Sequence, residues 1–213
     1  MKIIDLSHPF QPGQPHFPGD PDQVTETVAE IDSDGFLMHR YTLVGPWGTH
    51  VDAPSHFDPN GRSLDQIPSS ELVLPLIVIR FTDSGLITAQ HLEDHEATHG
   101  TIPKGSFVAL HSGWEWGAQG TAPGWSISAL ELLHHRGVTA IGHDLPDTDP
   151  ELQAQSWWLH HDHWQVENLI NLEQVPDRGA MIVCNFPVPV GGASFPIRPL
   201  ALIPGFIPGF IPD

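Results

Sequence analysis

The chain has 213 residues, of which 26 are acidic and 8 are basic, and its formal charge at pH 7 is −18. This charge argues against nucleic acids and anionic membrane surfaces as partners, because proteins bind both through basic patches. The length fits a single domain, which at this size buries about 70% of the surface that the unfolded chain exposes.

Cysteine usage and hydropathy bear on the cellular compartment. Cys184 is the only cysteine, so an internal disulfide and a cysteine-rich zinc site are both excluded. It lies in the apolar run 180–184, where we expect a packed thiol rather than a nucleophile. Residues 1–5 lack the apolar core of a signal peptide, and no segment approaches about 18 consecutive apolar residues. We therefore expect a cytoplasmic protein with no membrane partner.

Short β-rich runs alternate with helical patterns along the chain. Runs bounded mostly by Gly, Pro, Asp or Asn predict strands at 36–44, 74–81, 106–111, 138–143 and 179–184. Caps predict one helix from Thr88 to about residue 96 and another after Ser126 that stops at Gly137, and a third helix near residue 150 carries Trp157 and Trp158. Strands interleaved with helices predict an α/β domain, although periodicity does not fix the strand order.

The carboxyl-terminal tail has a composition of its own. Residues 203–212 repeat a four-residue Ile-Pro-Gly-Phe unit, which is too short for a solenoid and too rich in proline for a helix. We expect a main domain over 1–202 and an arm over 203–213. The arm either packs on its own domain or on a neighbouring subunit, or it is disordered.

Residues 48–57 are the most informative segment, with the sequence Gly-Thr-His-Val-Asp-Ala-Pro-Ser-His-Phe. In an extended conformation alternate residues project to one side, so His50 and Asp52 can meet one cation while His56 stays close enough to move a proton. Neutral imidazole and carboxylate suit zinc or manganese. The competing interpretation is a loop bounded by glycine and proline, whose histidines make only local hydrogen bonds.

This segment resembles the G-T-H-x-D-x-P-x-H-F signature of the cyclase family, which includes bacterial kynurenine formamidases and isatin hydrolases. Other segments resemble further blocks of that family in the same order: residues 4–8, 17–21, 113–114, 141–144, 167–172 and 195–201. The resemblance spans nearly the whole chain. It implies the swivelling β/β/α architecture of the family around a mixed β-sheet.

The resemblance also implies roles for single residues. Glu167 resembles the family glutamate that binds metal and takes part in catalysis, and His56 resembles the proton donor and acceptor. Phe17 matches a position where relatives place an aromatic side chain against the substrate ring. With His50 and Asp52 as metal ligands, the resemblance implies a metal-dependent hydrolase of a carbon–nitrogen bond in a small amide or cyclic amide. The metal would polarise the carbonyl and His56 would carry a proton to the departing nitrogen.

Two positions depart from the family pattern. Family members commonly carry a metal-binding histidine where this chain has Pro46, and related two-metal enzymes carry another where this chain has Gln155. We therefore expect at most one firmly bound metal per chain. If residues 157–167 continued as a helix, His160, His163 and Glu167 would share a face and could form an alternative cluster.

The sequence is compatible with three functions. The leading one is the amide or lactam hydrolase, acting on a small molecule as a homodimer or higher homo-oligomer. A second is a relative that keeps the pocket as a small-molecule binding protein and has lost turnover through Pro46 and Gln155. A third uses the same Lewis acid for ring closure or dehydration.

Overall fold

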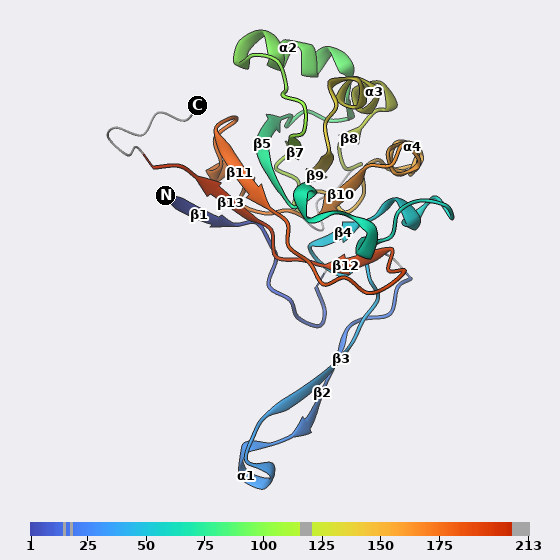
Figure 1. Cartoon of the computed structure of the whole chain (residues 1–213), viewed down its shortest axis with the longest axis vertical. Coiled ribbons are helices and arrows are strands. Elements are labelled where there is room, and N and C mark those ends of the chain that lie inside the picture. Colours follow the sequence, from blue (N-terminus) through green and yellow to red (C-terminus); the bar gives the residue numbers. More distant parts are fainter. Residues whose placement is uncertain (15, 18, 116–120, 206–213) are drawn as a thin grey trace.

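A computed structural model describes residues 1–14, 16–17, 19–115 and 121–205. Its centre is a mixed nine-stranded sheet in the order β1-β13-β11-β5-β7-β9-β10-β4-β12 (Figure 1). In that order the strands are Lys2–Asp5, Leu200–Ile203, Ala180–Val183, Val73–Arg80, Phe107–His111, Ala140–His143, Trp164–Glu167, His50–Asp52 and Ser194–Pro196. The central strands from β5 to β10 run parallel, and antiparallel strands flank them on both sides. This confirms the predicted α/β class with a mixed sheet.

Both faces of the sheet are buried, which β5 shows most clearly. Leu74, Leu76 and Val78 belong to one core cluster, whereas Ile77 and Ile79 belong to the other. Side chains alternate across a strand, so one apolar strand can supply two cores. The predicted strands at 74–81, 106–111, 138–143 and 179–184 are confirmed as β5, β7, β9 and β11.

Three helices cover one face of the sheet: α2 (Ala89–His99), α3 (Ile127–Arg136) and α4 (Gln153–His160). The predicted caps of α3 are present. The Ser126 hydroxyl accepts a hydrogen bond of 3.2 Å from the Ala129 amide, and Gly137 ends the helix with a φ of 72°. Trp158 is fully buried from α4 against this face. The remaining short elements are β6 (Leu86–Ile87), β8 (Gly124–Trp125) and the 3-10 turns Pro54–His56, Leu64–Gln66, Ser69–Glu71 and Leu172–Gln174.

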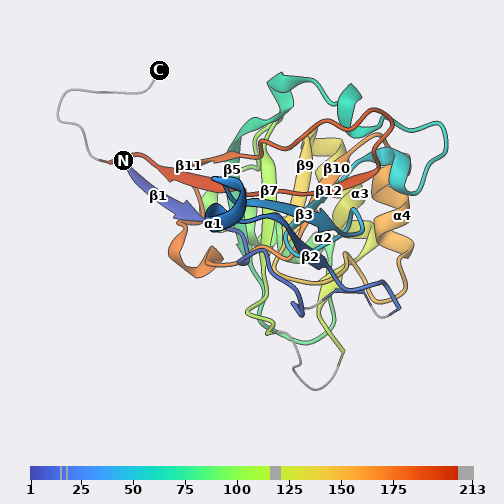
Figure 2. The same ribbon diagram turned by 90° about the horizontal axis from the view of Figure 1, so that it is seen from below.

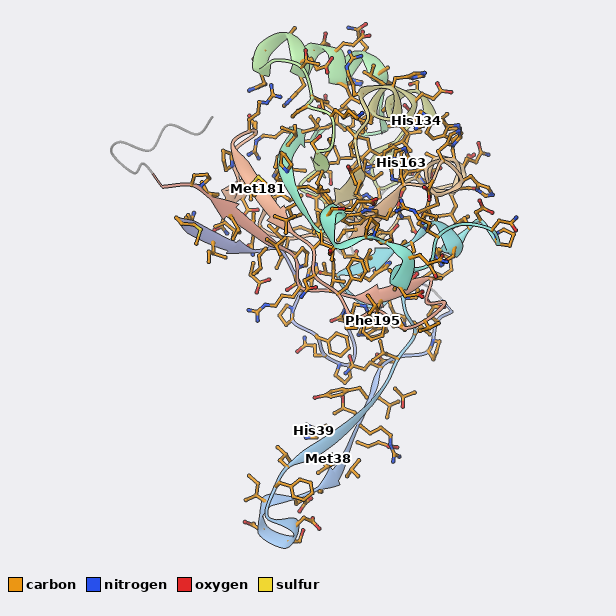
Figure 3. The ribbon with its side chains drawn as sticks, in the orientation of Figure 1. Met38, His39, His134, His163, Met181 and Phe195 are labelled. Carbon is orange, nitrogen blue, oxygen red and sulfur yellow. The ribbon has the colours of Figure 1, made fainter. Side chains whose placement is uncertain are left out.

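A hairpin stands apart from this body. Strands β2 (Val24–Ala29) and β3 (Met38–Thr42) pair with each other, and the one-turn helix α1 (Ile31–Asp34) closes their tip. The hairpin projects away from the sheet in Figure 1 and towards the viewer in Figure 2. Met38 and His39 lie along it in Figure 3, far from the other labelled side chains. Its large apolar side chains are 47–64% exposed: Val24, Val28, Ile31, Phe36, Leu37, Met38 and Tyr41.

The structure locates the cysteine and the start of the expected carboxyl-terminal arm. Cys184 is fully buried beside β11, as predicted, and burial raises its pKa. The expected arm 203–213 begins with the last residue of β13, and residues 206–213 lie outside the described part of the chain. None of the helices in the described ranges is long and apolar enough to cross a membrane.

Candidate metal centre

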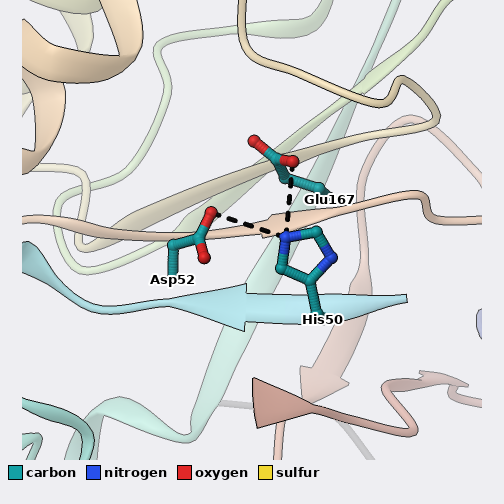
Figure 4. A group of neighbouring side chains, drawn as sticks. All are labelled: His50, Asp52 and Glu167. Atoms are coloured by element: carbon teal, nitrogen blue, oxygen red, sulfur yellow. Dashed lines mark ion pairs between the residues drawn. The ribbon is translucent and has the colours of Figure 1, made fainter. Parts of the chain in front are cut away.

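Two neighbouring strands bring His50, Asp52 and Glu167 together. In the antiparallel pair of β4 and β10, His50 lies opposite Glu167 and Asp52 lies opposite Gln165. The Nε2 atom of His50 lies 3.4 Å from Glu167 Oε2 and 3.6 Å from Asp52 Oδ2 (Figure 4). One possible ligand atom from each side chain lies within 4.8 Å of the other two, and all three residues are buried. The structure thus places the sequence-predicted ligand set around one point.

Hydrogen bonds hold the two carboxylates in place. The Ser194 hydroxyl on β12 donates to Asp52 Oδ1 over 2.6 Å. The Gln165 amide donates to Glu167 Oε1 over 2.7 Å and to Asp52 Oδ2 over 3.2 Å, and its own oxygen accepts from Thr148 at 2.8 Å. Glu167 is therefore held through Oε1, which leaves Oε2 on the side of His50.

The His50 ring is oriented by its own backbone neighbourhood. Its Nδ1 atom lies 2.9 Å from the Gly48 carbonyl oxygen, so Nδ1 carries the proton that it donates there, and Nε2 faces the two carboxylates. Gly48 has a φ of 63°, and a Cβ at this position would collide with the Gln14 side chain. The glycine of the motif thus allows the close approach that positions the imidazole.

Burial and mutual repulsion set the protonation of the metal-free site. Burial raises the pKa of Glu167 well above its usual range, and the Asp52 and Asp147 carboxylates raise it further. Burial also raises the pKa of Asp52, but the nearby His50 more than offsets this, and the pKa of Asp52 ends below its usual value. Burial lowers the pKa of His50, yet Asp52 outweighs burial and the net shift is upward. Without a cation, the site therefore holds protons that a bound dication would displace.

The three residues open on a cavity of about 250 Å³. Its walls also include the other predicted site residues, His56 and Phe17, and the two departures from the family pattern, Pro46 and Gln155. The strand β4 ends at Asp52, and residues 54–56 form a 3-10 turn, so the expected extended alternation through His56 is wrong. Pro54 starts this turn because proline fits its first position and cannot continue a ladder. The turn still brings His56 to the wall of the cavity.

A larger cavity of about 590 Å³ lies beside β1 and β12, and its lining includes none of the predicted ligand or proton-transfer residues. The volume of a cavity therefore does not identify the candidate reaction site in this protein. The smaller cavity is the candidate site because titratable side chains converge on it.

The alternative cluster of His160, His163 and Glu167 does not form. Helix α4 ends at His160, and Glu167 lies on strand β10, which pairs with both β9 and β4. His163 instead stacks on Trp158 with ring centroids 3.9 Å apart, and its Nε2 lies 2.8 Å from His134 Nδ1. His134, on α3, and His163, which follows α4, lie near each other in Figure 3. Strand pairing overrides the helical pattern at this point.

Other residues at the site were not predicted from the sequence. Gln165 shares the face of Glu167 because the two are separated by one residue on a strand. The sequence predicts this shared face if residues 164–167 are assigned to a strand. Asp147 lines the cavity in the turn after β9, at the carboxyl end of a parallel strand, where α/β sites gather. Burial, together with Asp52 and Asp149, raises the pKa of Asp147 to about 6. Ser194 carries no local signal.

His143 is the remaining unpredicted neighbour. It is fully buried at the end of β9, and its Nε2 lies 3.7 Å from Glu167 Oε1. Among the described residues neither ring nitrogen has a hydrogen-bond partner, and burial lowers the pKa of His143 to about 3. The sequence shows this histidine only as one of several that follow strand-like runs.

The residues present fit a divalent cation. One imidazole nitrogen and two carboxylates face a common point, in a buried site where carboxylates alone would repel each other. The Gln155 Oε1 and Asn168 Oδ1 atoms are buried in residues that line the same cavity, and neither has a hydrogen-bond partner in the described part of the chain. Such a donor set is typical of a metal site rather than of a structural ion pair.

Comparisons with known proteins agree with this geometry. The curated isatin hydrolase of Roseibium aggregatum is 27% identical over 96% of this chain and 92% of its own length. The structure of an isatin hydrolase bound to the product analogue thioisatinate superposes with a TM-score of 0.89 at 25% identity, covering 96% of this chain and 93% of that one. Isatin hydrolase A from Labrenzia aggregata, bound to benzyl benzoate, gives a TM-score of 0.86 at 26% identity, covering 95% and 93%.

A family model covers most of the chain as well. The model described as "Putative cyclase" matches residues 4–150, which include the segment 48–57 and the ends of strands β4 and β9. The confirmed fold, the convergence of the motif residues and this match lead to one assignment: the chain belongs to the cyclase family.

Proposed function

We propose that this protein is a metal-dependent hydrolase that cleaves a carbon–nitrogen bond in a small amide or cyclic amide. The observation that carries the proposal is the buried group His50, Asp52 and Glu167, which opens on a cavity also lined by His56. The similarity to isatin hydrolases over nearly the whole chain supports a cyclic amide as the substrate class.

The ligand residues prepare the site before a substrate enters. His50, Asp52 and Glu167 would hold the cation, and Gln165 and Ser194 keep the carboxylates oriented through the hydrogen bonds described above. A bound divalent cation supplies Lewis acidity: it polarises a carbonyl oxygen and lowers the pKa of water towards about 7. The ligand count supports at most one firmly held ion per chain, zinc or manganese, because Pro46 offers no donor.

His56 and Phe17 act on the substrate side of the cavity. His56 is exposed and lies on the cavity wall, so its imidazole can take a proton and deliver it to the departing nitrogen without being fixed as a ligand. Phe17 is 50% exposed on the same wall and can pack against a planar ring. Glu167 remains a second proton carrier in the metal-free state, since burial raises its pKa.

The exposed apolar hairpin supports the homo-oligomer, with the homodimer as its simplest form. The hairpin exposes large apolar side chains along its strands and at its tip, and such a surface is typical of an association site. Replacing Ile31, Phe36 and Leu37 by serine should give a monomer in light scattering, and an unchanged mass would contradict this part of the proposal. The single buried thiol supports a cytoplasmic enzyme.

Elemental analysis and a substrate panel test the function. Protein purified without a chelator or a histidine tag should contain about one zinc or manganese per chain. It should hydrolyse members of a panel of N-formyl arylamines, isatin-like lactams and lactones, with Asp52→Asn as the matched inactive variant. If the protein holds no metal and binds an aromatic amide without hydrolysing it, the result would instead support a small-molecule binding protein. A product of ring closure or dehydration would instead support a cyclase or dehydratase that uses the same Lewis acid.

A further inference from the structure

Two histidines meet outside the candidate metal centre. His134 lies on α3 and His163 lies between α4 and β10, and Figure 3 shows the two side chains near each other. The Nδ1 atom of His134 lies 2.8 Å from the Nε2 atom of His163. The ion pairs between histidines and carboxylates in the described part of the chain involve other histidines. The two imidazoles therefore bond to each other rather than to an acidic partner.

The surroundings of His163 hold its ring in place. The ring stacks on Trp158, with planes 14° apart, and Trp158 is fully buried. The Nδ1 atom of His163 lies 3.3 Å from the Thr139 carbonyl oxygen. Histidines that bind metals almost always donate their second ring N–H to a group such as a backbone carbonyl, which directs the other nitrogen to the ion. His163 is therefore positioned as a metal ligand through Nε2.

Both imidazoles favour the neutral form that metal binding requires. Burial lowers the pKa of His163 to about 4, and burial together with neighbouring histidines lowers the pKa of His134. With Nδ1 of His163 donating to Thr139, its Nε2 accepts from the protonated Nδ1 of His134. Moving that proton to Nε2 of His134, an exposed residue, frees both facing lone pairs without a change of charge.

We propose that His134 and His163 form a second metal site, which binds a borderline transition-metal ion such as Cu²⁺, Ni²⁺ or Zn²⁺ through His134 Nδ1 and His163 Nε2. Two metal–nitrogen bonds of about 2.0–2.1 Å that meet at about 90–110° place their nitrogens about 2.8–3.4 Å apart. The observed separation of 2.8 Å is at the lower end of this range. An ion therefore needs only a small outward shift of the exposed His134 ring.

The donors of this site differ from those of the candidate metal centre. Among the described residues, no third His, Cys, Asp or Glu brings a ligand atom within 4.8 Å of both nitrogens, so water would complete the coordination. Imidazole pairs suit copper, nickel and zinc, with copper bound most tightly, whereas carboxylate oxygens suit manganese. With two protein ligands instead of three, the ion is held more loosely than at the candidate metal centre and binds in addition to it. The inference goes beyond the proposed function and does not rest on it.

Copper titrations of untagged protein stripped with a chelator test the inference. Pulsed electron paramagnetic resonance of Cu²⁺ counts the coordinated imidazoles, and calorimetry gives the dissociation constant. Cu²⁺ should bind to wild type and to Asp52→Asn, which impairs the candidate metal centre, with a signal from two imidazoles. Because loss of an outer partner of a metal ligand already costs about 10–100-fold, His134→Gln and His163→Gln should each weaken this binding by at least about 30-fold. Each should also abolish the two-imidazole signal.

His135→Gln is the matched control, because it removes the neighbouring exposed imidazole of α3, whose Nδ1 atom is bonded to the Glu131 carbonyl. It should change the Cu²⁺ dissociation constant by less than about threefold and keep the two-imidazole signal. The midpoint of thermal unfolding of each metal-free variant checks that it is folded, and the exposed His134→Gln decides the result if His163→Gln is not.

Three results would overturn the inference. Equal losses for His135→Gln and His134→Gln would mean that the ion binds diffusely to the histidine-rich surface. A copper spectrum with a single imidazole would exclude the pair as ligands. Loss of the two-imidazole signal in Asp52→Asn, with its retention in His134→Gln, would assign the ion to the candidate metal centre.

Discussion

Replacing His143 by leucine should reduce the loss of folding stability that the metal-free protein suffers as the pH falls. His143 is fully buried, neither ring nitrogen has a partner among the described residues, and burial lowers its pKa from 6.5 to about 3. The unfolded chain therefore takes up a proton as the pH falls below 6.5, whereas the folded protein does not until the pH is near 3. The folded state accordingly loses stability over this window as the pH falls.

The pKa difference gives the size of this loss. Each pH unit below 6.5 costs about 1.4 kcal/mol, so the penalty is about 3 kcal/mol at pH 4.5. This is a large part of the roughly 5–15 kcal/mol by which folded domains are stable. A leucine cannot be protonated, and it also removes two unsatisfied nitrogens from the core.

Urea unfolding in a chelator, followed by tryptophan fluorescence, measures the effect. The free energy of unfolding of His143→Leu minus that of wild type should be about 3 kcal/mol larger at pH 4.5 than at pH 7.5. His143→Met repeats the test with a more adaptable side chain in case leucine overpacks the site. His39→Leu, at an exposed position on the hairpin, is the control and should show no such change. A difference for His143→Leu that is the same at both pH values would refute the reasoning.

The remaining predictions concern the cation and the proton carrier. His56→Ala should lower kcat by about 10²–10⁴ with unchanged metal content, and full activity would reassign the proton transfer. Histidine at both Pro46 and Gln155 should raise the metal content per chain in elemental analysis, and no increase would contradict the ligand count. Affinity for a divalent cation should fall as the pH falls, because burial and the neighbouring carboxylates raise the pKa of Glu167 and its proton competes with the metal. Calorimetry in buffers of different ionisation enthalpy should detect proton release on binding, and pH-independent binding would argue against this. Asp147→Asn should stabilise the metal-free protein by about 1–3 kcal/mol at pH 8 but not at pH 4, because its raised pKa makes the charged form unfavourable; equal stability at pH 8 would contradict this sign.

Local patterns in the sequence determined much of the fold and part of the site. The nearly continuous apolar run of 74–81 identifies a strand buried on both faces, and Ser126 and Gly137 mark the ends of α3. His50 and Asp52 share a face because they are two residues apart on one strand. These features depend on neighbours within a few residues, so they can be read from the chain itself, and the resemblance to the cyclase family extended them to Glu167.

Only the tertiary structure decided what surrounds these ligands. The pairing of β4 with β10 and β12 brings Gln165 and Ser194 to Asp52, although they lie 113 and 142 positions from it in the sequence. The same pairing makes residues 164–167 a strand, which ruled out the helical cluster with His160 and His163. Asp147 and Gln155 reach the cavity from a turn and from α4. Contacts of this kind depend on which distant segments pair, and that choice is set by the packing of the whole sheet rather than by any local pattern.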